Sequence, residues 1–190
     1  MNETLYLILE IIRVDIFIAF GLCSILYLIL SLCSRKAIVK TFDLYACKTV
    51  VYSGIIFFLV WIAVVLSAYI EGAPDDRLGM TQRMFGPYWF GYWLQPLLYI
   101  ILSQILRLKK VRKQIVLRIL IALVFIITVE QFVILITSFH RDYLPSSYRM
   151  NMSTSELVVG LVFKLLLFVV LTSLLYLYDV KVKSKIFNQN

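Results

Sequence analysis

Five long apolar segments, separated by short polar stretches, dominate the chain. They cover about residues 5–32, 49–70, 88–106, 114–138 and 157–178. None of them alternates apolar and polar positions as a strand of a barrel does, so the pattern favours helices. At about 1.5 Å per residue, each segment is long enough to cross roughly 30 Å of hydrocarbon. The pattern predicts an all-α fold in which residues 1–190 form one polytopic transmembrane helical bundle of about five helices.

Composition supports a lipid environment. Hydrophobic residues make up 62% of the chain and charged residues 16%, whereas a soluble domain has roughly 45–50% apolar and 25% charged residues. One core cannot bury that excess, so lipid has to cover part of the surface. The chain starts with Met1-Asn2-Glu3 and lacks a basic region before its first apolar segment. We therefore expect that segment to be retained as a helix and not cleaved as a signal peptide.

Basic residues are distributed unevenly between the connections. Most of the 19 lysines and arginines lie in the first connection, in the third connection or after the fifth segment: Arg35, Lys36, Lys40, Lys48, Arg107, Lys109, Lys110, Arg112, Lys113, Arg118, Lys181, Lys183 and Lys185. The second and fourth connections balance their few arginines with acidic residues. Because positive residues mark the cytoplasmic side, this predicts an outside N-terminus and a cytoplasmic C-terminus in a bacterial inner membrane.

The basic residues that mark the cytoplasmic side account for the net charge of +8. Anionic lipid headgroups are the partner that it favours, and a nucleic-acid partner is not indicated. The three cysteines have no metal-binding spacing, and His140 is the only histidine. We expect no metal site, no cofactor bound by the chain itself and no hydrolytic catalysis, because no serine or cysteine is placed as a nucleophile beside His140.

Five ionisable residues fall within the apolar segments: Glu10, Arg13, Asp15, Glu130 and Lys164. Such groups are costly in a bilayer and require an explanation. Glu10 and Arg13 are three residues apart and can pair on one helix face. Glu130 and Lys164 have similar predicted depths and are the best candidates for a pair between helices. Three interpretations stay open for the set: structural ion pairs or groups that reach interface water, a proton or quinone path, and pairs with charges of another subunit.

Two glutamines in the third segment have a structural interpretation. Gln95 and Gln104 lie nine positions apart in a mostly apolar sequence. Polar side chains inside membrane helices commonly form hydrogen bonds to a neighbouring helix. We expect that role for both residues and do not expect them to bind a ligand.

Several sequence runs resemble a known family. They are GPYWFGYW at residues 86–93, LKKVR at 108–112, EQFVI at 130–134 and TSFHRDYLPSS at 137–147. These runs resemble polysulfide-reductase-type membrane subunits. They are most similar to the second half of the quinol-oxidising membrane subunit of bacterial alternative complex III. The resemblance covers about residues 49–178, and the first helix is unmatched.

The resemblance implies partners for the chain. Family members pass quinol electrons to outer-face iron–sulfur or cytochrome subunits, and some are thought to move protons along buried polar residues. Glu130 would then belong to a polar route, and the outer face would contact a partner through His140, Arg141, Asp142, Tyr143 and Pro145. Menaquinone or ubiquinone is the candidate quinone of the complex. The chain departs from the family in lacking the first helical bundle, with which the quinol site is chiefly associated, and in having Gln131 where an arginine is expected.

Three functional hypotheses follow from the sequence. In the first, the chain is an accessory or anchoring subunit of a respiratory quinol-linked complex, contributes a proton path and has no activity of its own. In the second, it is a non-redox scaffold or assembly subunit that keeps only the family fold. The third is a small transporter or channel, which would need several copies because five helices leave little room for a pore.

Overall fold

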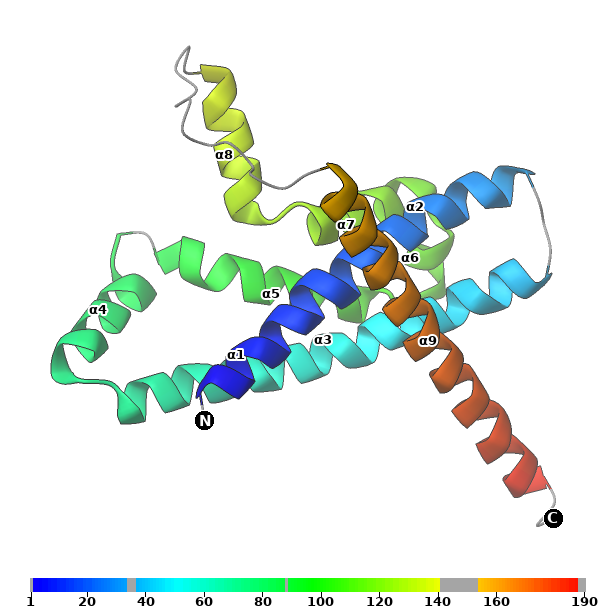
Figure 1. Ribbon diagram of the computed structural model, residues 1–190, viewed down its shortest axis with the longest axis horizontal. Helices are drawn as coiled ribbons and strands as arrows, with labels where there is room; N and C mark the ends of the chain where they lie inside the picture. Colours follow the sequence, from blue (N-terminus) through cyan, green and yellow to red (C-terminus); the bar gives the residue numbers. More distant parts are fainter. Residues whose placement is uncertain (1, 34–36, 88, 141–153, 188–190) are drawn as a thin grey trace.

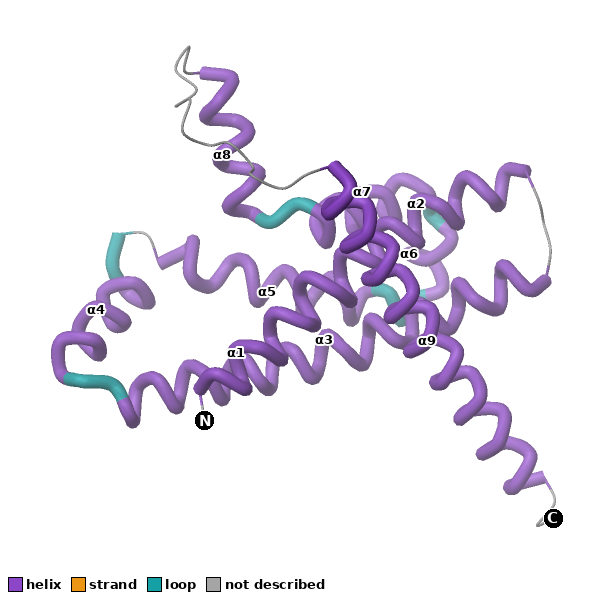
Figure 2. Tube along the Cα trace, in the orientation of Figure 1, coloured by secondary structure: helices purple, strands orange, loops and turns teal. Residues whose placement is uncertain are grey.

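The structure of the chain, a computed structural model, describes residues 2–33, 37–87, 89–140 and 154–187. All regular secondary structure in these ranges is helical, as Figure 2 shows. The elements in chain order are α1 (Asn2–Glu10), η1 (Ile11–Phe17), α2 (Ile18–Cys33), α3 (Ala37–Glu71), α4 (Pro74–Phe85), α5 (Trp89–Ile105), α6 (Lys109–Lys113), α7 (Ile115–Ile126), α8 (Val129–His140) and α9 (Thr154–Phe187).

Three helical stretches of the described chain are long and apolar enough to cross a membrane: Glu3–Ser31, Ala37–Glu71 and Val158–Val182. The first combines α1, η1 and α2, because the residues at both borders of η1 keep right-handed helical angles. The π-helical section η1 only widens the turns in the middle of this helix. The prediction of an all-α chain with several candidate membrane-spanning helices is thus confirmed.

The helix α3 begins at Ala37, well before the expected start near residue 49. Residues 37–53 contain neither glycine nor proline, so nothing in the sequence interrupts the helix there. Lys40, Asp43 and Lys48 therefore lie on α3 and not in a loop. This extension brings their side chains beside α7 and α9, where two of them form ion pairs.

The fourth apolar segment, expected as one helix over residues 114–138, is divided into α7 and α8. Ile127 is extended (φ −105°, ψ 116°) and ends α7. Thr128 and Gln131 then form a capping box: the amide of Gln131 donates to Thr128 Oγ1 at 3.2 Å, and the amide of Thr128 donates to Gln131 Oε1 at 3.1 Å. Because such a box supplies the first turn with hydrogen bonds, it begins a new helix within an apolar segment.

The first long helix, α3 and α5 run back and forth beside one another (Figure 1). The end of α2, the start of α3 and α6 lie toward one end of the molecule, whereas the N-terminus and α4 lie toward the other. The helix α9 crosses α2 and α3, and its C-terminal half extends away from the other helices. Most apolar side chains of α9 are exposed, which leaves them to lipid or to another protein.

Four aromatic rings from four different elements form the centre of the core. Phe17 of η1 stacks on Phe125 of α7 at 4.8 Å between centroids, and it contacts Tyr99 of α5 at 4.9 Å and Phe57 of α3 at 5.7 Å. Each of these side chains is at most 5% exposed. Aromatic pairs at such distances add to the stabilisation that burial provides. The cluster therefore joins the first helix to α3, α5 and α7.

Small residues allow close approach of the helices around this core. A Cβ atom at Gly54 of α3 would lie 1.9 Å from Ser103 Oγ of α5. A Cβ atom at Gly21 of α2 would lie 2.8 Å from the carbonyl oxygen of Ala122 in α7. Beside the first contact, Gln104 Nε2 donates to the carbonyl of Val51 at 3.0 Å. The expected hydrogen bond of Gln104 to a neighbouring helix is confirmed.

Candidate functional site

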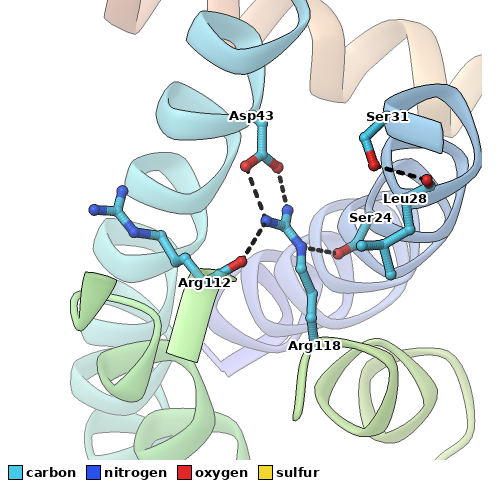
Figure 3. A network of polar contacts seen from close by, with 6 residues as sticks. All are labelled: Ser24, Leu28, Ser31, Asp43, Arg112 and Arg118. Atoms are coloured by element: carbon cyan, nitrogen blue, oxygen red, sulfur yellow. Dashed lines mark hydrogen bonds and ion pairs between the residues drawn. The ribbon is translucent and has the colours of Figure 1, made fainter. Parts of the chain in front are cut away.

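The most completely paired polar side chain in the described chain is that of Arg118, which is 1% exposed. Its Nη1 and Nη2 atoms donate to the two carboxylate oxygens of Asp43, the former at 2.8 Å. Its Nε atom donates to Ser24 Oγ at 2.7 Å, and Nη1 also reaches the carbonyl of Arg112 at 3.5 Å (Figure 3). The guanidinium carbon lies 4.8 Å from the centre of the Tyr27 ring.

This Arg118 network joins α2, α3, α6 and α7. Two-point pairing of a guanidinium with a carboxylate is strong and directional. A buried charge of this kind is tolerated only when its partners are all in place, so the network fixes how the four elements meet. Four of the five N–H groups of the guanidinium donate to protein atoms. We therefore interpret the Arg118 network as a structural clamp.

Sequence reasoning missed this pair. Asp43 falls between the first two apolar segments and belongs to no predicted helix, and the charge pattern uses Arg118 only as one of the basic residues that indicate orientation. The absence of glycine and proline between residues 37 and 53 was the available signal that Asp43 belongs to a helix. The partner of that carboxylate depends on how α7 packs, which no local pattern indicates.

A second ion pair ties α3 to α9. Lys48 Nζ donates to Asp179 Oδ2 at 2.5 Å. The same ammonium group lies 4.5 Å from the centre of the Tyr45 ring, which packs edge-on against Tyr176 at 5.1 Å. The side chains of the pair are 36% and 29% exposed, so solvent or headgroups screen it more than the Arg118 network.

A pocket toward the end of the molecule where the N-terminus and α4 lie is the better candidate for chemistry; we refer to it as the outer pocket, after the side that the charge pattern predicts for this end. It has a volume of about 390 Å³ and is lined by Tyr6, Leu9, Glu10, Arg13, Phe57, Trp61, Gln95, Pro96 and Tyr99. The lining combines aromatic and aliphatic side chains with one acid, one base, one amide and two phenols. That is the usual make-up of a small-molecule site: mostly apolar, with a few polar groups.

Two buried polar groups of the outer pocket lie one turn apart on α5. They are the amide nitrogen Nε2 of Gln95 and the hydroxyl of Tyr99, and neither bonds to another element of the described chain. Nearly all buried polar groups in proteins are paired, and these two side chains interact with one another. The other end of the Gln95 amide is satisfied, because Oε1 accepts from the backbone amide of Val129 at 2.7 Å. The expected helix–helix hydrogen bond of Gln95 is thus confirmed, and only the oxygen of its side-chain amide takes part in it.

The structure brings together two of the ionisable residues selected from the sequence. Glu10 and Arg13 both line the outer pocket, but their side chains, which the structure describes, form no ion pair with each other. Arg13 lies in η1, where the wider π-helical turn moves residues three apart off a common face. Asp15 is half-buried in η1, and Lys164 is half-buried in α9.

The remaining selected residues are beyond what the structure describes. Glu130 is the second residue of α8 and His140 its last, but their side chains are outside the described part. Arg141, Asp142, Tyr143 and Pro145 lie outside the described residues altogether. The pairing of Glu130 with Lys164 and the partner-binding role of residues 140–145 therefore stay predictions.

Within the described residues, no group of three histidine, cysteine or carboxylate side chains could hold a metal ion. The chain was also compared with known proteins. No family model, curated protein or solved structure matches it. The resemblance to polysulfide-reductase-type subunits thus rests on the sequence runs alone and stays a prediction.

Proposed function

We propose that the chain is an accessory, anchoring membrane subunit of a bacterial respiratory quinol-linked electron-transfer complex. The observation that carries this proposal is the hydrogen bond from the amide of Val129 to Gln95 Oε1. Gln95 closely follows the run at residues 86–93, and Val129 directly precedes the run at 130–134. Two of the four runs that carry the resemblance thus begin or end close to one another, and Gln95 between them lines the outer pocket.

The proposed orientation in the inner membrane has five crossings, with the N-terminus outside and the C-terminus in the cytoplasm. The Arg118 network supports it, because Asp43 and Arg112 flank connections that the charge pattern assigns to the same side. The ion pair of Lys48 with Asp179 supports the same side of the membrane for the C-terminal part of α9. The shorter α5, and α7 with α8, would form the third and fourth crossings, with Gln95 covering the break between α7 and α8.

The outer pocket gives the subunit a proposed role in proton or quinol handling. Glu10 and Arg13 lie at its rim, while the phenol of Tyr99 and the amide of Gln95 lie within its wall. A row of carboxylate, phenol and amide groups can hold a short chain of hydrogen-bonded water molecules within an apolar protein interior. Such a chain would lead from Glu10 toward the start of α8, where Glu130 follows Val129.

Copurification tests the proposal. The tagged full-length protein is extracted in mild detergent, its partners are identified by mass spectrometry, and a reduced-minus-oxidised haem spectrum is recorded. Stoichiometric cytochrome or iron–sulfur subunits are expected. Recovery of the chain alone, or only with non-redox partners, would overturn the assignment. In the complex, Tyr99→Phe is expected to lower quinol turnover while leaving the subunit composition unchanged.

A membrane scaffold without a redox role is the second candidate. The observation that favours it is the exposed apolar surface of α9, including Val159, Phe163 and Leu166, which offers a face for another membrane protein. Under this alternative, Glu130→Gln and Lys164→Gln would alter assembly or stability and leave turnover unchanged. The Tyr99→Phe variant separates the two candidates, because only the first predicts an effect on turnover.

A further inference from the structure

A second pocket lies beside the Arg118 network, at the opposite end of the molecule from the outer pocket. Its volume is about 520 Å³, and it is formed by α2, α3, α6 and the start of α7. Its lining comprises Tyr27, Leu28, Ser31, Lys40, Asp43, Leu44, Lys109, Arg112, Lys113 and Ile115. We refer to it as the basic pocket.

The basic pocket has a strong excess of positive charge. Lys40 comes from α3, whereas Lys109, Arg112 and Lys113 come from α6. In the described part of the chain, none of these four cations forms an ion pair. The one carboxylate of the lining, Asp43, has both oxygens engaged by Arg118. Like charges gathered without counter-charges repel one another, so the arrangement favours an anion in the pocket.

The lining also contains apolar side chains. Leu28, Leu44 and Ile115 belong to the ends of α2, α3 and α7 that face the pocket. Ile115 is 54% exposed and Leu44 is 37% exposed, so both retain accessible apolar surface. The pocket thus combines four cations with accessible apolar side chains, at the end of helices long enough to span a membrane. This combination suits a phosphate headgroup with its acyl chains.

From this geometry we infer that the basic pocket binds the phosphate headgroup of an anionic membrane lipid. Lys40, Lys109, Arg112 and Lys113 contact the phosphate, and Leu28, Leu44 and Ile115 contact the upper acyl chain. Basic pockets between membrane helices commonly take such lipids on the cytoplasmic side. The bound headgroup neutralises the cations of α6 next to the backbone carbonyl that Arg118 uses, and so stabilises the clamp. This inference does not depend on the proposed respiratory role.

Lipid titration followed by native mass spectrometry tests the inference. Delipidated full-length protein in neutral detergent is titrated separately with phosphatidylglycerol and phosphatidylcholine, and the lipid-bound fraction is measured. The parent chain is expected to bind phosphatidylglycerol more tightly. The variant Lys40→Gln/Lys113→Gln removes two exposed cations that make no described hydrogen bond. It should weaken phosphatidylglycerol binding about 25-fold, since each basic residue near an anionic headgroup contributes about fivefold.

The matched control removes the same charge elsewhere. The variant Arg77→Gln/Arg83→Gln loses two cations of α4, at the far end of the molecule, and should bind phosphatidylglycerol as the parent does. An equal loss in both double variants, or equal affinity of the parent for the two lipids, would overturn the inference. A third arm adds inorganic phosphate at the lipid concentration. Displacement of phosphatidylglycerol there would identify a free-phosphate site and exclude the lipid assignment.

Discussion

The backbone amide of Val129 donates a hydrogen bond of 2.7 Å to Oε1 of Gln95, on a helix 34 positions earlier in the chain. Val129 is the first residue of α8, where backbone amides have no partner within their own helix. In the proposed fourth crossing no water would replace that partner, so the break between α7 and α8 would require a neighbouring side chain. Gln95 provides it, and Thr128 and Gln131 provide the rest of the cap. Specific hydrogen bonds therefore stabilise the break between α7 and α8.

The variant Gln95→Leu tests this role. Leucine has a similar size but cannot accept a hydrogen bond, so the amide of Val129 loses its partner at a cost of about 1–3 kcal/mol. We expect hydrogen exchange of the peptide covering residues 127–131 to become faster by roughly tenfold or more. The control is Gln104→Leu, which removes the bond to Val51 but leaves Val129 paired. Unchanged exchange in Gln95→Leu, or equal acceleration in both variants, would contradict the assignment.

The Arg118 network leads to a prediction about stability. Asp43→Leu leaves a buried guanidinium without its counter-charge, which should lower the free energy of unfolding by about 3–5 kcal/mol. The double variant Asp43→Leu/Arg118→Met removes both charges and should recover much of the loss. Thermal unfolding of the full chain in detergent measures each effect. If the double variant is no more stable than Asp43→Leu, the loss does not arise from the unpaired charge.

The more exposed pair of Lys48 and Asp179 serves as the control for that experiment. Its side chains are 36% and 29% exposed. Exposed ion pairs contribute only about 0–1 kcal/mol, so Lys48→Gln should shift the melting temperature little. A shift as large as that of Asp43→Leu would show that burial does not distinguish the two pairs.

Substitutions at glycine test the close contact between α3 and α5. The Cβ atom of Gly54→Ala would lie 1.9 Å from Ser103 Oγ, so the two helices must separate. Overpacking of this kind costs about 1–3 kcal/mol. Gly160 has no atom within 4 Å of an added Cβ, and Gly160→Ala in α9 should stabilise the helix by about 0.5–1 kcal/mol. Opposite shifts in thermal unfolding are expected, and shifts of the same sign would contradict the packing.

The sequence was sufficient where a feature depends on local pattern. The apolar segments predicted the all-α architecture and several candidate membrane-spanning helices, because periodicity and length are properties of each segment alone. Gln104 was expected to bond a neighbouring helix, since an amide in an apolar segment has few other uses. The partner, the carbonyl of Val51, could not be named, because it depends on the approach of α3 and α5 at Gly54.

The sequence failed where function and packing depend on several segments. The outer pocket combines Arg13 of η1 with Tyr99 and Gln95 of α5; the last two are four positions apart on one helix, but no spacing in the chain links them to Arg13. Gln131 stands where the resembled family has an arginine, and the structure gives it a role that the resemblance does not indicate, as half of a capping box. The capping box was visible as Thr128-x-x-Gln131, but the apolar residues around it favoured one continuous helix.

The proposed orientation predicts which end of the molecule faces the cytoplasm. A cysteine at Gln82, on the exposed surface of α4, should react with a membrane-impermeant maleimide in intact cells. A cysteine at Lys110, on α6, should react only after lysis, because the basic residues of the third connection hold it inside. The parent chain, with its three native cysteines, gives the background labelling. Labelling of the Lys110 cysteine in intact cells, and of the Gln82 cysteine only after lysis, would invert the topology. The basic pocket would then face the outside, and the anionic lipids of the cytoplasmic leaflet could not reach it.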